Sequence, residues 1–245
     1  MFDDALIDAR LPVLSDVAIR QVFDEIDANG FSCIPNYIHA EDLSRMQDFV
    51  AMAVARSQNE YVVLRGSDAV LGSGMDELAT SAQFTSIFSR LYELAFGNNA
   101  PQVTFYQILR CLTGKGAARN SLIFHYDSYL ITGLIPVTIP ATGNKGDLLL
   151  FPNTRKVRAF YATNLFDKLL LDNRITQAIL RVLARSRNTP FVRVQMVPGN
   201  LYLFWGYRSI HTNEPCAPDK VRATALFHFA DPHAASSLKA SLRAS

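Results

Sequence analysis

The chain has 245 residues, a hydrophobic fraction of 49% and a formal net charge of +2. This length suits one domain of the larger all-β or α+β kind, and the apolar content supports a sizeable core. The near-neutral charge argues against nucleic-acid binding, which requires clustered basic residues. We therefore predict a folded protein that does not bind nucleic acid.

The cysteines and the N-terminus indicate the cellular compartment in which the protein is expected. The three cysteines lie far apart and form no Cys-x-x-Cys pair, which argues against zinc or a disulfide framework and is typical of a reducing compartment. The N-terminus lacks the features of a signal peptide, and no stretch approaches the roughly 18 apolar residues of a membrane span. We expect a soluble cytoplasmic protein without membrane spans, and the sequence leaves its oligomeric state open.

The first hundred residues have a largely helical pattern, with short strands between the helices. Helices are predicted at 16–29, 40–56 and 75–96, and strands at 31–34 and 61–64. Ser15 is the expected N-cap of the first helix. Residues 66–74 contain three glycines and two serines, which favours a mobile loop and makes them a candidate lid over a pocket.

From residue 103 the pattern changes to short β-rich runs separated by turn residues. Strands are predicted at 103–112, 121–130, 131–139, 147–151, 191–197, 200–206 and 221–230. Strands with such even spacing indicate an antiparallel sandwich or jelly roll. A helical stretch at 164–185 interrupts them and is expected to pack on the outside of the sheet.

The predicted fold class is α+β, mainly β. We expect a double-stranded β-helix (jelly roll, cupin-like), with N-terminal helices packed on one sheet and a helical insertion between later strands. The prediction is a single domain spanning 1–245. Its parts are a helical support region at 1–100, a jelly-roll core at 101–230 with the insertion at 160–188, and a flexible Ala/Ser-rich tail at 234–245.

A candidate metal site lies in this predicted β region. His125 and Asp127 are two apart on a predicted strand, so their side chains point to the same face. The other His-x-acid tripeptide, at 39–41, begins a predicted helix, where residues two apart diverge by about 200° and cannot bind one ion. His211, from a later part of the β region, would complete a set of two imidazoles and one carboxylate. Such a set binds divalent iron and leaves coordination positions open.

Arg222 lies eleven residues after His211 and opens the last predicted strand. Burying an unpaired charge is costly, so an arginine on this apolar strand requires an anionic partner. That partner is either an acidic residue of the chain or a ligand carboxylate, which the planar guanidinium can bind with two hydrogen bonds. The sequence leaves both alternatives open. His228 shares this face but lies deeper, and we interpret it as structural.

Together these pieces resemble the phytanoyl-CoA dioxygenase-type branch of the iron(II)/2-oxoglutarate oxygenases. The matching segments are residues 22–48, 125–127, 146–153 and 198–204, with His211 and Arg222 at the interval characteristic of the branch. The resemblance implies that His125, Asp127 and His211 bind iron. It also implies that Arg222 binds the distal carboxylate of 2-oxoglutarate.

The resemblance implies two further contacts to this co-substrate. Gln107 lies eighteen residues before His125, on the strand where the branch often carries a glutamine. Asn213 lies two residues after the distal histidine, where the branch tends to have serine, and its amide can still hydrogen-bond a carboxylate.

Three aromatic residues are candidates for the substrate pocket. Strand parity directs Tyr129 toward the metal face, and we expect Tyr106, Trp205 and the 66–74 loop to contribute. The alternative for each aromatic side chain is the ordinary core, where such residues on strands are more common.

The implied activity is oxidation by Fe(II), 2-oxoglutarate and O₂ of a small-molecule, lipid or metabolite substrate, by hydroxylation of an unactivated C–H bond with release of succinate and CO₂. Asp127 favours hydroxylation over halogenation, because the halogenating relatives replace this carboxylate with a small residue. Two alternatives stay open: a non-catalytic jelly-roll binding module, and a cupin-like metalloenzyme that does not use 2-oxoglutarate. The sequence identifies neither the prime substrate nor the role of the 152–190 segment.

Overall fold

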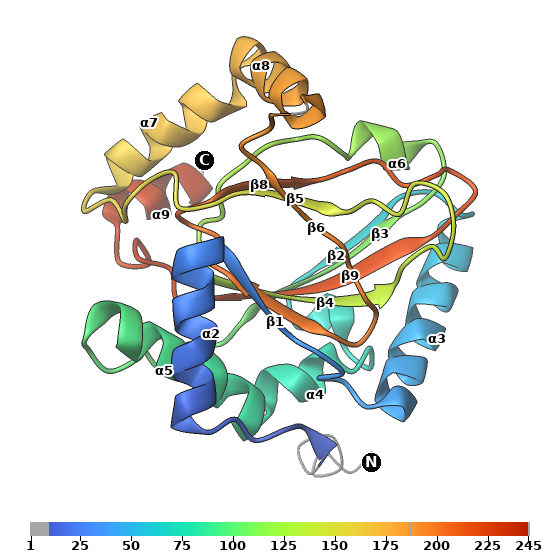
Figure 1. The fold of residues 1–245 in the computed structure, drawn as a ribbon, viewed down its shortest axis with the longest axis horizontal. Helices are drawn as coiled ribbons and strands as arrows, with labels where there is room; N and C mark the ends of the chain where they lie inside the picture. Colours follow the sequence, from blue (N-terminus) through green and yellow to red (C-terminus); the bar gives the residue numbers. More distant parts are fainter. Residues whose placement is uncertain (1–9, 187, 245) are drawn as a thin grey trace.

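Two antiparallel sheets face each other in the computed structural model, which describes residues 10–186 and 188–244 (Figure 1). The larger sheet has the strand order β1-β7-β4-β9-β3-β2 and the smaller has the order β6-β5-β8. The strands are β1 (Phe31–Ile34), β2 (Val62–Arg65), β3 (Tyr106–Leu112), β4 (Ile131–Thr138), β5 (Leu148–Phe151), β6 (Val192–Val194), β7 (Leu201–Phe204), β8 (Ile210–Asn213) and β9 (Arg222–Phe229). This arrangement is consistent with the predicted jelly roll.

Side chains alternate across the larger sheet, and the register of β3 and β9 shows which face is which. Arg110 pairs with Thr224, and both line cavities on the side of the smaller sheet. The next pair, Leu109 with Ala225, belongs to the hydrophobic core on the opposite face. The face toward the smaller sheet thus carries polar side chains beside apolar ones such as Leu134, whereas the opposite face of the same strands packs into the main hydrophobic core.

The N-terminal helices cover the outer face of the larger sheet. They are α2 (Asp16–Asn29), α3 (Ala40–Arg56), α4 (Met75–Thr80) and α5 (Ala82–Phe96), and Figure 1 shows α2, α4 and α5 together on one side. As predicted, the hydroxyl of Ser15 caps α2 by accepting a hydrogen bond from the N–H of Ala18 at 3.2 Å. Aromatic rings join α5 to the sheet, with Phe84 and Phe227 centroids 4.8 Å apart.

The predicted helix at 75–96 is two helices, and so is the predicted insertion helix. Ser81 separates α4 from α5 and accepts a hydrogen bond from the N–H of Phe84. Asn173 separates α7 (Tyr161–Asp172) from α8 (Arg174–Arg185) and accepts from the N–H of Thr176. Each break occurs where an N-cap side chain competes with continued helix. Leu171 and Leu180 pack against the smaller sheet, but most of the other apolar side chains of α7 and α8, among them Phe166, Leu169 and Ile175, are exposed.

Several loop and terminal segments differ from the predicted secondary structure. The 66–74 segment contains a short 3-10 helix, η1 (Asp68–Val70), with Val70 and Ser73 buried, and none of its residues lines the cavity beside the candidate metal ligands. The predicted flexible tail contains α9 (Ser237–Ala244), where Lys239 is buried and pairs with Asp231. The predicted strand at 121–130 reduces to a single bridge at His125, and a short helix, α6 (Gly116–Arg119), precedes it.

The N-terminal region does more than support the sheets. Its strands β1 and β2 form the two edges of the larger sheet. Within the described residues, no helix is both long and apolar enough to cross a bilayer.

Phe84 tests the importance of the outer core, because its side chain is fully buried among aromatic rings. We expect Phe84→Ala to lower the free energy of unfolding by about 3–5 kcal/mol, since it removes buried area and leaves a cavity. The control is Phe160→Ala, whose side chain is 73% exposed, and which should change stability by less than about 0.5 kcal/mol. Urea denaturation followed by circular dichroism measures both, and equal effects would contradict this view of the core.

Candidate metal centre

Backbone pairing between a loop and β8 brings two histidines together. The N–H of His125 donates to the carbonyl of His211 at 3.1 Å, and the N–H of His211 donates back at 3.0 Å. In such an antiparallel pair, opposed side chains lie on the same face of the sheet. The two imidazole centroids are consequently 4.4 Å apart.

Asp127 completes the set from the same loop. Its Oδ1 lies 3.8 Å from Nε2 of His125 and 3.4 Å from Nε2 of His211. Three ligand atoms, each about 2.1 Å from a common ion, lie roughly 3–4 Å from one another. The three residues each offer a ligand atom within 4.8 Å of the others and could hold a metal ion. The structure therefore brings the three predicted ligands together.

Hydrogen bonds to the backbone orient both imidazole rings. Nδ1 of His125 lies 3.0 Å from the carbonyl oxygen of Ile123, and Nδ1 of His211 lies 3.0 Å from that of Ser209. A carbonyl oxygen only accepts hydrogen bonds, so Nδ1 carries the ring proton in this arrangement. The lone pair is then on Nε2, the atom nearest Asp127, which is the tautomer that binds a metal on that side.

The second oxygen of Asp127 is held by a neighbouring strand. Thr132 donates to Oδ2 at 2.5 Å, which leaves Oδ1 directed at the two imidazoles. A Cβ on Gly206 would lie 2.2 Å from Oδ2 and 2.3 Å from the Thr132 hydroxyl, so only glycine fits beside this pair. Burial opposes ionisation of Asp127, but His211 and His228 outweigh it and hold the pKa of the carboxyl well below its usual range. Asp127 is therefore a carboxylate fixed for coordination.

His228 lies closer to the ligand set than the sequence suggested. Its Nδ1 is 3.1 Å from the Thr132 hydroxyl and 3.6 Å from Oδ2 of Asp127. The ring also stacks near Tyr129, with centroids 5.3 Å apart. His228 thus supports the residues around the metal ligands and forms part of the adjoining cavity wall.

Arg222 is a buried cation that forms no ion pair among the described residues. Its Nε has no hydrogen-bond partner, and Nη1 reaches only the Thr224 hydroxyl at 3.5 Å. Burial, with a contribution from nearby Arg110, lowers the pKa of Arg222 to about 10. A narrow cavity is lined by Arg222 together with His125 and His211. The alternative of a ligand carboxylate as its partner stays a prediction.

Asn213 lines the same narrow cavity, but its polar atoms are already bonded. Its Oδ1 accepts from Nη1 of Arg110 at 2.9 Å, and its Nδ2 donates to the Ser121 hydroxyl at 3.0 Å and to the Glu214 carbonyl at 2.8 Å. Asn213 is thus well placed to position Arg110 beside the cavity, and a direct contact to a co-substrate remains a prediction.

Two predicted site residues lie on the wrong face. Gln107 sits between Tyr106 and Ile108, which both line the cavity, so its side chain points away from the ligand set. Trp205 packs against Phe23 of α2 with centroids 5.9 Å apart, and its indole N–H donates to Asp27. The expected co-substrate contact of Gln107 and the expected pocket position of Trp205 do not agree with these placements.

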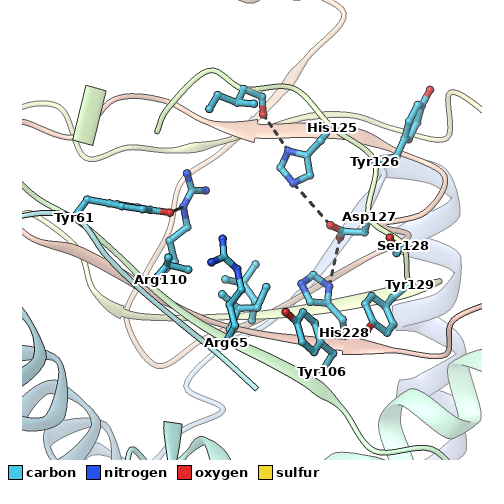
Figure 2. A pocket seen from close by; sticks show the side chains of 14 residues that line it. Tyr61, Arg65, Tyr106, Arg110, His125, Tyr126, Asp127, Ser128, Tyr129 and His228 are labelled. Atoms are coloured by element: carbon cyan, nitrogen blue, oxygen red, sulfur yellow. Dashed lines mark hydrogen bonds and ion pairs between the residues drawn. The ribbon is translucent and has the colours of Figure 1, made fainter. Parts of the chain in front are cut away.

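A cavity of about 410 Å³ opens beside the ligand set, within the range of small-molecule sites (Figure 2). Both predicted tyrosines line it, and Tyr106 and Tyr129 have near-parallel rings with centroids 5.6 Å apart. Sequence reasoning missed Arg65 and Arg110, which also line this cavity. Strand parity was the available signal for Arg110, because it shares a face with Tyr106.

Comparisons with known proteins place this geometry in a known fold. No family model and no curated protein matches the chain. The prolyl hydroxylase from Trichoplax adhaerens, solved with a hypoxia inducible factor oxygen degradation domain peptide fragment, is 16% identical with a TM-score of 0.56. That match covers 89% of this chain and 92% of the other. A prolyl-4-hydroxylase from Pseudomonas putida is 10% identical with a TM-score of 0.55, covering 86% and 98%.

A third similar structure is the non-heme alpha ketoglutarate dependent epimerase SnoN from nogalamycin biosynthesis. It is 14% identical with a TM-score of 0.57, and the match covers 89% of this chain and 84% of the other. These likenesses confirm, in its coarse form, the predicted fold: the chain shares the jelly-roll fold of iron- and 2-oxoglutarate-dependent oxygenases. They do not single out the phytanoyl-CoA dioxygenase branch. Because one fold hosts many activities, the function has to be argued from the site.

Thr132 offers a test of the ligand set that leaves the ligands in place. Thr132→Val keeps the shape of the side chain but removes the hydrogen bond to Asp127, and we expect roughly 10- to 100-fold weaker binding of Mn(II) or Fe(II). The control is Thr138→Val on the same strand, which lines neither cavity and should bind the metal as the wild type does. Anaerobic calorimetric titration measures the affinities, and an unchanged affinity in Thr132→Val would contradict the orienting role.

Proposed function

We propose that the protein is a non-haem iron(II)- and 2-oxoglutarate-dependent oxygenase that hydroxylates an unactivated C–H bond of a small-molecule, lipid or metabolite substrate. The observation that carries the proposal is the pairing of the His125–Asp127–His211 set with Arg222 across one narrow cavity. A metal set alone fits many enzymes. A buried arginine without an acidic partner, opening onto the same space, is a feature expected of a site that binds a dicarboxylate.

The residues present fit both groups. Iron(II) is suited to two imidazole nitrogens and one carboxylate oxygen, which leave coordination positions for other ligands. The Nε of Arg222 has no hydrogen-bond partner in the protein and would donate to the distal carboxylate of 2-oxoglutarate. Apolar side chains enclose the space between them, from Leu134, Leu148, Phe204 and Leu226. In such surroundings the attraction between a guanidinium and a carboxylate is stronger than in water.

When bound, iron(II) with 2-oxoglutarate and O₂ supplies the oxidising power for C–H hydroxylation, with succinate and CO₂ as co-products. The chain's contribution is binding and orientation. His125, Asp127 and His211 fix the metal, and Thr132 holds the carboxylate ligand in place. The presence of Asp127 supports hydroxylation over halogenation. The interval of eleven residues between His211 and Arg222 supports the phytanoyl-CoA dioxygenase-type branch. We also propose that the protein acts in the cytoplasm.

The chain's two His-x-acid tripeptides provide a matched pair of variants for the metal ligands. His125→Ala should abolish 2-oxoglutarate-dependent succinate formation and remove the weak visible absorption band that iron(II) and 2-oxoglutarate produce together without oxygen. His39→Ala should retain both, because His39 is exposed at the start of α3. A non-catalytic binding module would give no band in the wild type and would keep its ligand affinity in His125→Ala.

Arg222 distinguishes the proposed oxygenase from a metalloenzyme that does not use 2-oxoglutarate. Arg222→Gln should weaken 2-oxoglutarate binding by about 2–3 kcal/mol, because it removes a charge-assisted pair of hydrogen bonds. Calorimetry with a redox-inert divalent ion in the site measures this loss. The control is Arg193→Gln, whose guanidinium is exposed and paired with Glu214. Intact turnover and intact 2-oxoglutarate affinity in Arg222→Gln would contradict the proposed function.

A further inference from the structure

The charge lining the 410 Å³ cavity is predominantly positive. Arg65 and Arg110 face it, and among its lining residues the only carboxylate is Asp127, which belongs to the metal set. A cavity that combines two arginines with no free acid favours an anionic ligand. Arg222 does not account for this charge, because it lines the neighbouring narrow cavity and not this one.

Arg65 is the arginine of this cavity whose N–H groups are not engaged in hydrogen bonds. It ends β2, at the edge of the larger sheet, and pairs in register with Ile108, which also lines the cavity. Opposed residues share a face, so Arg65 points between the sheets, and Figure 2 shows its guanidinium extending into the open space across from Asp127. Among the described residues it has no hydrogen-bond or ion-pair partner. Its planar guanidinium is therefore available to a ligand.

Arg110 contrasts with Arg65 because its donors are in use. Its guanidinium donates to the carbonyl of Asn120, to Oδ1 of Asn213 at 2.9 Å and to the hydroxyl of Tyr61 at 3.3 Å. All three acceptors are neutral, so the hydrogen bonds fix the position of the guanidinium without compensating its charge. Arg110 therefore adds positive potential beside Arg65 while Arg65 keeps its hydrogen bonds free.

Three aromatic rings form the wall nearest the metal ligands. The centroids of Tyr106, Tyr129 and His228 are 5.6, 5.3 and 6.2 Å apart, and their planes differ by at most 26°. Three similar distances describe a triangle, whereas a column of stacked rings would make one distance the sum of the others. The rings thus form a largely apolar part of the cavity wall close to Asp127.

We propose that this cavity binds a small substrate with an acid group at one end, and that Arg65 determines this specificity by binding the acid group. The inference rests on the proposed function and adds the chemical class of its substrate. The carbon skeleton would lie on the Tyr106–Tyr129–His228 surface and reach the metal ligands. From β2 to β9 the cavity floor crosses two strand spacings, about 10 Å in all, so the oxidised carbon lies several bonds from the acid group.

The group that Arg65 would bind is a compact anion. It could be a carboxylate or a phosphate, and an experiment can distinguish the two. A carboxylate and a phosphate both match the two parallel donors of a guanidinium. Matched probes are 3-phenylpropanoate, 2-phenylethyl phosphate and the neutral 3-phenylpropanamide. They share an aromatic body that fits the ring-lined wall and differ in the terminal group. Each is titrated into the protein with Zn(II) and saturating 2-oxoglutarate, so that acid binding at Arg222 does not contribute.

The wild type should bind at least one of the acids roughly 10- to 100-fold more tightly than the amide, the range expected for hydrogen bonds to a charged group. Arg65→Gln should lose this preference. Because Arg65 is exposed, this variant should fold as the wild type does. Arg119→Gln is the matched control, since Arg119 is also exposed and does not line the cavity. It should keep the preference, and whichever acid it favours identifies carboxylate or phosphate as the source.

The inference is overturned if the wild type shows no preference for either acid, or if Arg65→Gln keeps it. These outcomes are separate from failure of the proposed function, which would appear as no 2-oxoglutarate binding to the wild type. In that event the titrations are repeated without 2-oxoglutarate, in Arg65→Gln and Arg222→Gln. Loss of the acid preference only in Arg65→Gln would still support an acid site at Arg65, and loss only in Arg222→Gln would overturn it.

Discussion

The candidate site depends on one short piece of backbone pairing. The two hydrogen bonds between His125 and His211 form an isolated bridge, because the loop that carries His125 makes no longer strand with β8. This bridge sets the separation of the imidazoles. Two further backbone hydrogen bonds hold the loop on either side of it, from the N–H of Leu122 to the carbonyl of Asn213 and from the N–H of Asp127 to the carbonyl of Gly206. The Thr132 side chain and the backbone of Gly206, which hold Asp127 in this position, come from other segments. The geometry of the three candidate ligands is thus fixed both by residues that are close in the sequence and by residues that are far apart in it.

The interior between the sheets carries positive charge that the described residues do not neutralise. Arg222 is fully desolvated and Arg110 bonds only neutral acceptors. Such an arrangement is costly in a protein without ligands. Any anion that binds there relieves the cost, so ligand binding and folding stability are coupled in this protein. The same uncompensated charge that destabilises the empty fold is the basis of the acid binding that we propose.

Sequence reasoning found the metal set because its signal is simple. Two residues of one strand-like segment share a face, and a later histidine and arginine at a characteristic interval complete the pattern. The same parity rule also shows why Gln107 was wrong: Tyr106 and Gln107 are adjacent, so they cannot both face the cavity. Trp205 was misplaced because an aromatic residue after a strand carries no sign of which side it faces. β8 was missed because its four residues lack an apolar run.

The parts of the interior come from separate lengths of chain. The metal ligands and Arg222 lie within residues 125–222, whereas Arg65 comes from β2, an outermost strand of the larger sheet. An outermost strand has a neighbour on one side only, so it tolerates replacement more readily than a central strand. If the proposed function holds, selectivity for new compounds can therefore be introduced by redesigning β2 alone, with the candidate metal ligands and Arg222 left untouched.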